Sequence, residues 1–164
     1  QNNFRNLMAG FAQQSYDLAI SLRFGETNSE MVALKARLAE RGLKVFLCDE
    51  APGVNLKRTI FGAFSEADLA IVAASATYGR QTTSGFSTYE EMNYFVTRKK
   101  PYFLIKMTET PGDDWEEDAT MFNFSTAVWE YWKPGSPVPA IVRMGSSGCG
   151  TMATSRVASA SSVS

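Results

Sequence analysis

The stretch Asp68-Leu69-Ala70-Ile71-Val72-Ala73-Ala74-Ser75 decides the fold. It is apolar from Leu69 to Ala74, without the alternation of polar and apolar residues typical of a half-exposed strand. A strand buried on both faces has this composition, and such strands occur in parallel sheets covered by helices on each side. The stretch therefore predicts the centre of a parallel sheet.

Strands and helices alternate along the chain on both sides of this stretch. Further strands are expected at 16–22, 44–48 and 102–107, with a possible fifth at 127–132. Helices are expected at 29–41, 56–67 and 88–100. Ser29 is a candidate cap for the first helix, and Gly42 suits its end. This order predicts an α/β domain with helices on both faces of the sheet, and ligands of such domains bind outside the carboxyl ends of the strands.

Length and composition favour one domain. The chain has 164 residues, and we expect an N-terminal extension over 1–14, a domain over 15–143 and a disordered tail rich in Ser, Ala and Gly over 144–164. The acidic segment 113–118 is expected at the surface. The sequence shows neither a signal peptide nor an apolar run of the roughly 20 residues that span a membrane, so a cytoplasmic location is expected.

The composition limits the chemistry that the chain can perform. There is no histidine, which excludes Ser-His-Asp and Cys-His catalysis and makes a zinc site with only Cys48 and Cys149 improbable. The net charge of −1 gives no reason to expect nucleic acid or membrane insertion. Any catalysis must therefore use carboxylates, tyrosine, lysine, cysteine or backbone groups, without a metal.

Three loops follow the expected strands and meet at one edge of the sheet. They contain residues 23–26, 49–53 and 86–90. Together with 16–21 and 68–75, these segments resemble, in the same order, the sequence boxes of the Toll/interleukin-1 receptor (TIR) domain family. The resemblance implies a flavodoxin-like three-layer sandwich with a central parallel sheet of about five strands.

The resemblance also implies an activity, because Phe86-x-x-x-Glu90 is similar to the aromatic-x-x-x-Glu of NAD-cleaving members. Glu90 would be the catalytic carboxylate that stabilises an oxocarbenium-like transition state when the nicotinamide–ribose bond breaks. Ser87-x-x-Glu90 is also a capping box, in which Glu90 would bind the backbone of Ser87. Glu91 is the neighbouring candidate if the register differs by one residue.

NAD+ would then be a substrate, and no separate cofactor is expected. The residues expected to contact it come from all three loops: Ser21, Arg23, Phe24, Gly25, Glu26, Asp49, Phe86 and Ser87. Arg23 could pair with a phosphate and Phe24 could stack on a base. An arginine in solvent and an apolar residue at the rim are the alternatives for these two positions.

The family resemblance implies partners as well as a substrate. Other TIR domains are expected to bind through the BB loop, which contains Asp49, Pro52 and Gly53, and NAD cleavage in immune or cell-death signalling would depend on that self-association. One alternative is an adaptor that acts by TIR–TIR contacts without catalysis. A nucleoside deoxyribosyltransferase-like enzyme, which also has a catalytic glutamate, is a third possibility.

Overall fold

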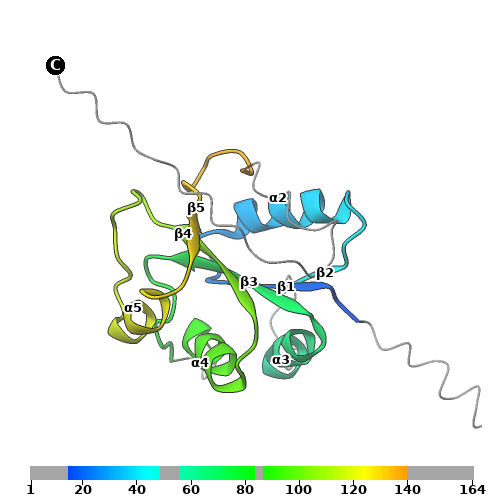
Figure 1. Ribbon diagram of the computed structural model, residues 1–164, viewed down its shortest axis with the longest axis horizontal. Helices are drawn as coiled ribbons and strands as arrows, with labels where there is room; N and C mark the ends of the chain where they lie inside the picture. Colours follow the sequence, from blue (N-terminus) through cyan, green and yellow to red (C-terminus); the bar gives the residue numbers. More distant parts are fainter. Residues whose placement is uncertain (1–14, 49–55, 84–86, 140–164) are drawn as a thin grey trace, which may run out of the picture.

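A five-stranded parallel sheet forms the centre of the computed structural model, which describes residues 15–48, 56–83 and 87–139 (Figure 1). The strands are β1 (Leu18–Leu22), β2 (Val45–Leu47), β3 (Leu69–Ser75), β4 (Tyr102–Met107) and β5 (Trp129–Tyr131). Their spatial order is β2-β1-β3-β4-β5, with every neighbouring pair parallel. This is the flavodoxin-like order, so the predicted fold class is confirmed.

β3 lies in the middle of the sheet, as its composition predicts. It pairs with β1 on one side and β4 on the other, and its residues from Ala70 to Ser75 are all buried. Apolar side chains dominate here because helices cover both faces of this strand.

Helices cover the two faces unequally (Figure 1). The helix α2 (Asn28–Ala39) covers one face, where Met31, Leu34 and Leu38 pack against Ile71 of the sheet. The other face carries α3 (Leu56–Glu66), α4 (Thr88–Arg98) and α5 (Asp118–Phe124). Their buried residues join one apolar cluster with the sheet: Ile60, Phe64, Met92, Phe95 and Phe124. The result is three layers around two apolar cores.

Two local details differ from the sequence analysis. The first helix begins at Asn28 with Thr27 in the capping position, so Ser29 is not its cap. The acidic segment 113–118 leads directly into α5, which has seven residues and was not predicted. The expected terminal extension and tail lie outside the described residues.

Gly79 fixes the distance between the loop after β3 and α5. It has φ +89°, and a Cβ atom there would lie 1.7 Å from Thr120 Oγ1. Thr120 donates a hydrogen bond to the carbonyl of Tyr78 at 2.9 Å, and the Gly79 amide donates to Thr88 Oγ1 at 2.8 Å. No larger residue fits at position 79, so Gly79 allows the close approach to α5 that places Tyr78 between α4 and α5.

Within the described part of the chain, none of the helices has both the length and the apolar composition needed to cross a membrane.

Candidate functional site

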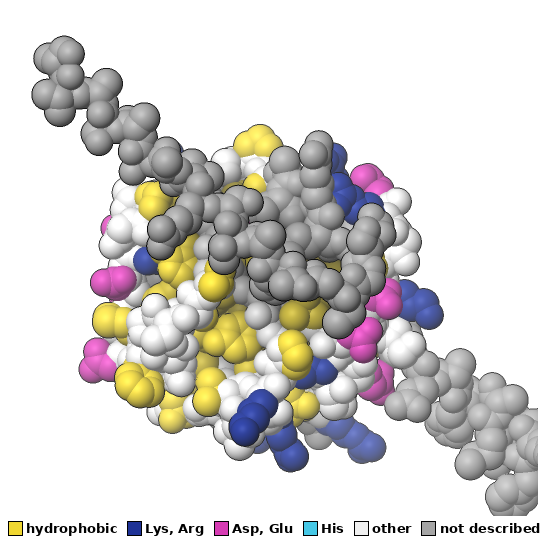
Figure 2. Space-filling model, viewed as in Figure 1, with side chains coloured by type: hydrophobic (Ala, Val, Ile, Leu, Met, Phe, Trp, Pro, Cys, Tyr) yellow, Lys and Arg dark blue, Asp and Glu magenta, His cyan; other side chains and the backbone are white. Residues whose placement is uncertain are grey.

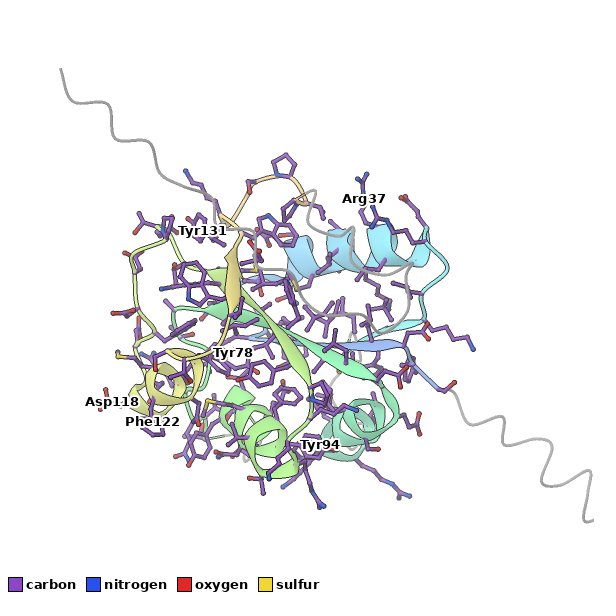
Figure 3. All side chains as sticks on the ribbon, in the orientation of Figure 1. Arg37, Tyr78, Tyr94, Asp118, Phe122 and Tyr131 are labelled. Carbon is purple, nitrogen blue, oxygen red and sulfur yellow. The ribbon has the colours of Figure 1, made fainter. Side chains whose placement is uncertain are left out.

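A buried group of three polar side chains lies at the carboxyl ends of the central strands. Ser21 comes from β1, Tyr78 from the loop after β3, and Glu91 from the first turns of α4. The three residues are distant in sequence, and the parallel arrangement of β1 and β3 brings them to the same edge of the sheet. Figure 3 shows Tyr78 between the sheet and the helices of its lower face.

The hydrogen bonds in this group have a defined direction. Ser21 donates through Oγ to Glu91 Oε2. The Tyr78 hydroxyl lies 2.5 Å from the same Ser21 oxygen. An ionised Glu91 can only accept, so Ser21 then gives its one proton to Glu91 and Tyr78 is the donor to Ser21. The chain of bonds therefore runs from Tyr78 through Ser21 to Glu91.

Burial controls the ionisation of Glu91, which is only 4% exposed. Loss of solvent raises its pKa from 4.5 to about 8, the Ser21 hydrogen bond opposes this rise, and the nearby Glu90 charge adds to it. Burial also raises the pKa of Tyr78, with a further contribution from the Glu91 charge. Glu91 is thus a carboxyl whose charge state changes near neutral pH, which is a common property of groups at functional sites.

Glu90 has the opposite environment although it is the adjacent residue. Its Oε2 accepts hydrogen bonds from the backbone amide of Ser87 at 2.7 Å and from the Ser87 hydroxyl at 2.6 Å. Its slight burial raises the pKa, but these bonds and the nearby Lys57 charge outweigh that and lower it. Glu90 is therefore an ionised partner in a capping box at the start of α4.

Helix geometry explains why two neighbouring glutamates differ so much. Consecutive residues of an α-helix point about 100° apart. Ser87 occupies the capping position, so Glu90 is the third helical residue and its side chain reaches back to the cap. Glu91 is on the side that faces β1 and shares this buried side with Met92 and Phe95.

A cleft of about 260 Å³ opens beside Glu91. Its lining comes from the loop after β1, from α3, from the loop before α4 and from α4 itself: Leu22, Arg23, Phe24, Leu56, Thr82, Ser87, Thr88 and Glu91. Phe24 is half exposed at the cleft, which suits stacking on a flat ring. In the described part of the chain, no group of three or more Cys, Asp or Glu side chains could hold a metal ion.

A network of charged groups joins the loops around this cleft. Arg23 pairs with Glu26 at 3.6 Å and donates to the carbonyl of Arg80 at 3.0 Å, while Glu26 also accepts a bond from Thr77. Arg80 in turn pairs with Glu116, and with Glu117 at 3.4 Å. Arg23 and Glu26 therefore connect the loop after β1 to the loop after β3, in addition to their positions near the cleft.

The structure brings together several of the residues that the sequence suggested. Ser21, Arg23, Phe24 and Ser87 lie in the buried group or line the cleft. Gly25 adopts φ +88° in the turn between Phe24 and Glu26, a conformation that favours glycine. The other predicted contacts, Asp49 and Phe86, lie outside the described residues, as do Pro52 and Gly53 of the BB loop.

The sequence analysis did not identify Tyr78, and it named Glu91 only as the alternative to Glu90 for the catalytic carboxylate. A tyrosine in a loop carries no sequence signal of its own, because its role depends on the close approach of β1 and α4. Glu91 did have a signal: a capping box at Ser87 and Glu90 uses the first carboxylate and leaves the second to point elsewhere.

Comparison with known proteins finds similarity among solved structures. No family model matches the chain, and no curated protein does. Among solved structures, the chain is similar to the TIR domains of the activated Roq1 resistosome directly recognizing the pathogen effector XopQ, with a TM-score of 0.43 and 21% sequence identity. The match covers 65% of this chain and 62% of that one, which is less than two thirds of its length. The fold assignment rests on the strand order.

Proposed function

We propose that this chain is an NAD+ nucleosidase of the TIR type, in which Glu91 is the catalytic carboxylate. The observation that carries the proposal is a single buried carboxyl, held by Ser21 and Tyr78, at the wall of a cleft at the carboxyl ends of the strands. When it is ionised, a carboxylate in such a partly dry site stabilises a nearby positive charge more strongly than it would in water. The sequence pattern favoured Glu90 for this role, and the capping bonds of Glu90 favour Glu91 instead.

The reaction needs only groups that the chain possesses. The bond between C1′ of the ribose and the nicotinamide nitrogen breaks, and its electron pair leaves with the nicotinamide, which becomes neutral. The ribose acquires oxocarbenium character, and the ionised Glu91 carboxylate stabilises that charge. The oxygen of water then bonds to C1′ and loses a proton, which gives ADP-ribose; attack by an adenine nitrogen gives a cyclic isomer.

Two further cleft residues could contact a dinucleotide. Phe24 would stack on a base, and Arg23 would reach a phosphate after giving up part of its pairing with Glu26. We propose in addition that the activity serves immune or cell-death signalling and depends on self-association, with other TIR domains as partners and the BB loop, Asp49, Pro52 and Gly53, as one contact.

A direct assay tests the proposal. The purified chain is incubated with NAD+ at high protein concentration, and free nicotinamide is measured over time for the wild type, Glu91→Gln and Glu90→Gln. We expect Glu91→Gln to lose about 10²- to 10³-fold in rate, because one transition-state stabiliser is removed. Glu90→Gln is the matched control, since glutamine also serves in a capping box, and it should retain most of the activity.

The outcomes separate the candidate functions. Loss of activity in Glu90→Gln but not in Glu91→Gln would return the role to Glu90. No nicotinamide release by the wild type at any concentration would contradict the enzymatic proposal and favour a non-catalytic adaptor.

A further inference from the structure

A groove between α3 and α4 combines an aromatic floor with basic rims. Phe61 and Tyr94 form the floor, with ring centroids 4.9 Å apart and ring planes inclined by 31°. Lys57, Arg58 and Arg98 are exposed around it, and the volume is about 700 Å³. We call these five residues the α3/α4 groove. It lies on the outer side of the helices, away from the cleft beside Glu91.

A second surface carries the opposite properties. Phe122 of α5 is 81% exposed, which is unusual for so large an apolar side chain. Asp118 is also exposed and precedes it by four residues, so the two lie on the same side of α5. We call Asp118 and Phe122 the α5 ridge. Asp114, in the segment that leads into α5, pairs with Lys106 at 3.8 Å, so Asp118 is the acidic group of the ridge.

The α5 ridge is held firmly in place from behind. Phe124 of the same helix is fully buried, with its ring centroid 5.5 Å from that of Trp115 and 5.9 Å from that of Tyr78. The exposed aromatic ring therefore projects from a packed helix and can enter a groove without a large cost in conformational entropy.

The two surfaces lie on different sides of one molecule. In Figure 2 several Lys and Arg side chains lie at the bottom, below α3 and α4, and Asp and Glu side chains lie at the left edge, on the side of α5, as well as at the right edge. Figure 3 shows Tyr94 at the bottom, near α3 and α4, and Asp118 with Phe122 at the lower left. A molecule cannot close this contact on itself, but a second copy can supply the missing half.

We infer that the α3/α4 groove binds the α5 ridge of a second copy of this chain. Phe122 would pack on Phe61 and Tyr94, and Asp118 would face Arg58 or Arg98. Charge complementarity selects this occupant, because the groove is basic and the ridge places the carboxylate of Asp118 beside an aromatic ring that matches the aromatic floor. The net charge of −1 leaves little overall repulsion between copies.

The contact is heterologous, because each copy uses two different surfaces. Such contacts continue from one copy to the next and build a ring or a filament unless one surface is lost. This inference rests on the self-association included in the proposed function, and it adds a contact outside the BB loop to the one proposed there.

Complementation between two variants tests the inference with the whole chain. Phe122→Ser removes the ridge and keeps the groove, and Arg98→Glu alters the groove and keeps the ridge. By sedimentation velocity, the wild type should form larger species as concentration rises. Each variant alone should associate at least tenfold more weakly. Their equimolar mixture should form a dimer that does not grow further, because only one intact ridge and one intact groove remain to pair.

Matched controls distinguish this contact from a general surface effect. Val128→Ser removes an apolar residue that is 79% exposed outside the ridge, and Arg37→Glu reverses an exposed charge on α2, on the opposite layer. Both should associate like the wild type, and thermal unfolding by circular dichroism verifies that all variants are folded.

The same samples separate this inference from the proposed enzyme function. Glu91→Gln should associate like the wild type while it loses nicotinamide release. A wild type that stays monomeric at all concentrations, variants that associate as it does, or a mixture that forms no dimer would each overturn the inference, whatever the result of the nicotinamide assay.

Discussion

The cleft beside Glu91 and the α3/α4 groove place their charged groups in opposite environments. At the wall of the cleft, the Glu91 carboxyl is enclosed by Ser21, Tyr78 and apolar side chains, so its ionisation is costly and its pKa is about 8. In the groove, Lys57, Arg58 and Arg98 are exposed to water, where charges are easily maintained but are screened by salt. Burial therefore changes the pKa of one carboxyl at the proposed catalytic site. The exposed charges of the groove can form only weak contacts, whose strength depends on the salt concentration.

Replacing Glu91 should have the largest effect on stability. The pKa of Glu91 is raised from 4.5 to about 8, so the folded state favours its protonated form. As pH rises above 4.5 the unfolded chain loses this proton first, and the stability of the wild type falls until the pH passes about 8. Glu91→Gln avoids this cost and should be more stable by roughly 3 kcal/mol at pH 7.

Denaturant unfolding at pH 5, 7 and 8.5 measures this difference. The advantage of Glu91→Gln should grow between the first two pH values. A constant difference between the two proteins across this range would show that Glu91 titrates normally.

The next effect concerns Tyr78. Tyr78→Phe removes the donor to Ser21 and should cost about 1.5 kcal/mol of folding free energy, because a buried hydrogen bond is lost. The bond from Ser21 to Glu91 weakens when Ser21 loses its own donor, so the pKa of Glu91 should rise further, by less than about one pH unit. The pH profile of nicotinamide release reports this shift. An unchanged midpoint would mean that Tyr78 acts only by packing.

Replacing the adjacent Glu90 should change the stability less than replacing Glu91, and this change should depend on pH in the opposite sense. Glu90→Ala removes the bonds to Ser87 and should destabilise the chain by about 1 kcal/mol at pH 7. Because the pKa of Glu90 is lowered, this contribution is present above its ordinary pKa and is lost as pH falls through the lowered value. Equal stability of the wild type and Glu90→Ala at pH 7 would argue against the capping box.

The smallest effect distinguishes exposed from buried charges directly. Raising NaCl from about 0.05 M to about 0.5 M should weaken self-association through the groove several-fold, because exposed charges are screened. The same change should move the midpoint of the Glu91 titration by less than about 0.3 pH units, because burial dominates its pKa. Association that is insensitive to salt would mean that the basic rim of the groove contributes nothing.

Much of this arrangement could be predicted from the sequence. The apolar run in β3 and the alternation of strands and helices around it were sufficient for the parallel sheet, because a strand buried on both faces needs a helix layer on each side. The helix α5 was not predicted because it has only seven residues and begins after Glu117 without a side-chain cap. It is stabilised by the packing of Phe124 against Trp115 and Tyr78. Such contacts between distant segments leave no local pattern.

The choice of the site carboxylate, Glu90 or Glu91, depended on a difference of one residue in the sequence pattern. The spacing from Phe86 pointed to Glu90, whereas the position of Ser87 as helix cap turns Glu90 back to the backbone and Glu91 inward. The sequence contained the capping pattern, but only the packing of α4 against β1 shows which glutamate reaches Ser21.

The pH dependence of nicotinamide release tests the central role of Glu91 most directly. The value of kcat/KM reports the ionisation of the free protein. For the wild type it should rise between pH 6 and 9 with a midpoint near 8, as Glu91 becomes charged. Glu90→Gln should show the same rise with its midpoint at a somewhat lower pH, because the Glu90 charge that helps to raise the pKa of Glu91 is gone, and Glu91→Gln should show little activity and no such rise. A wild-type profile that is flat over this range, or a rise that persists in Glu91→Gln, would contradict the account.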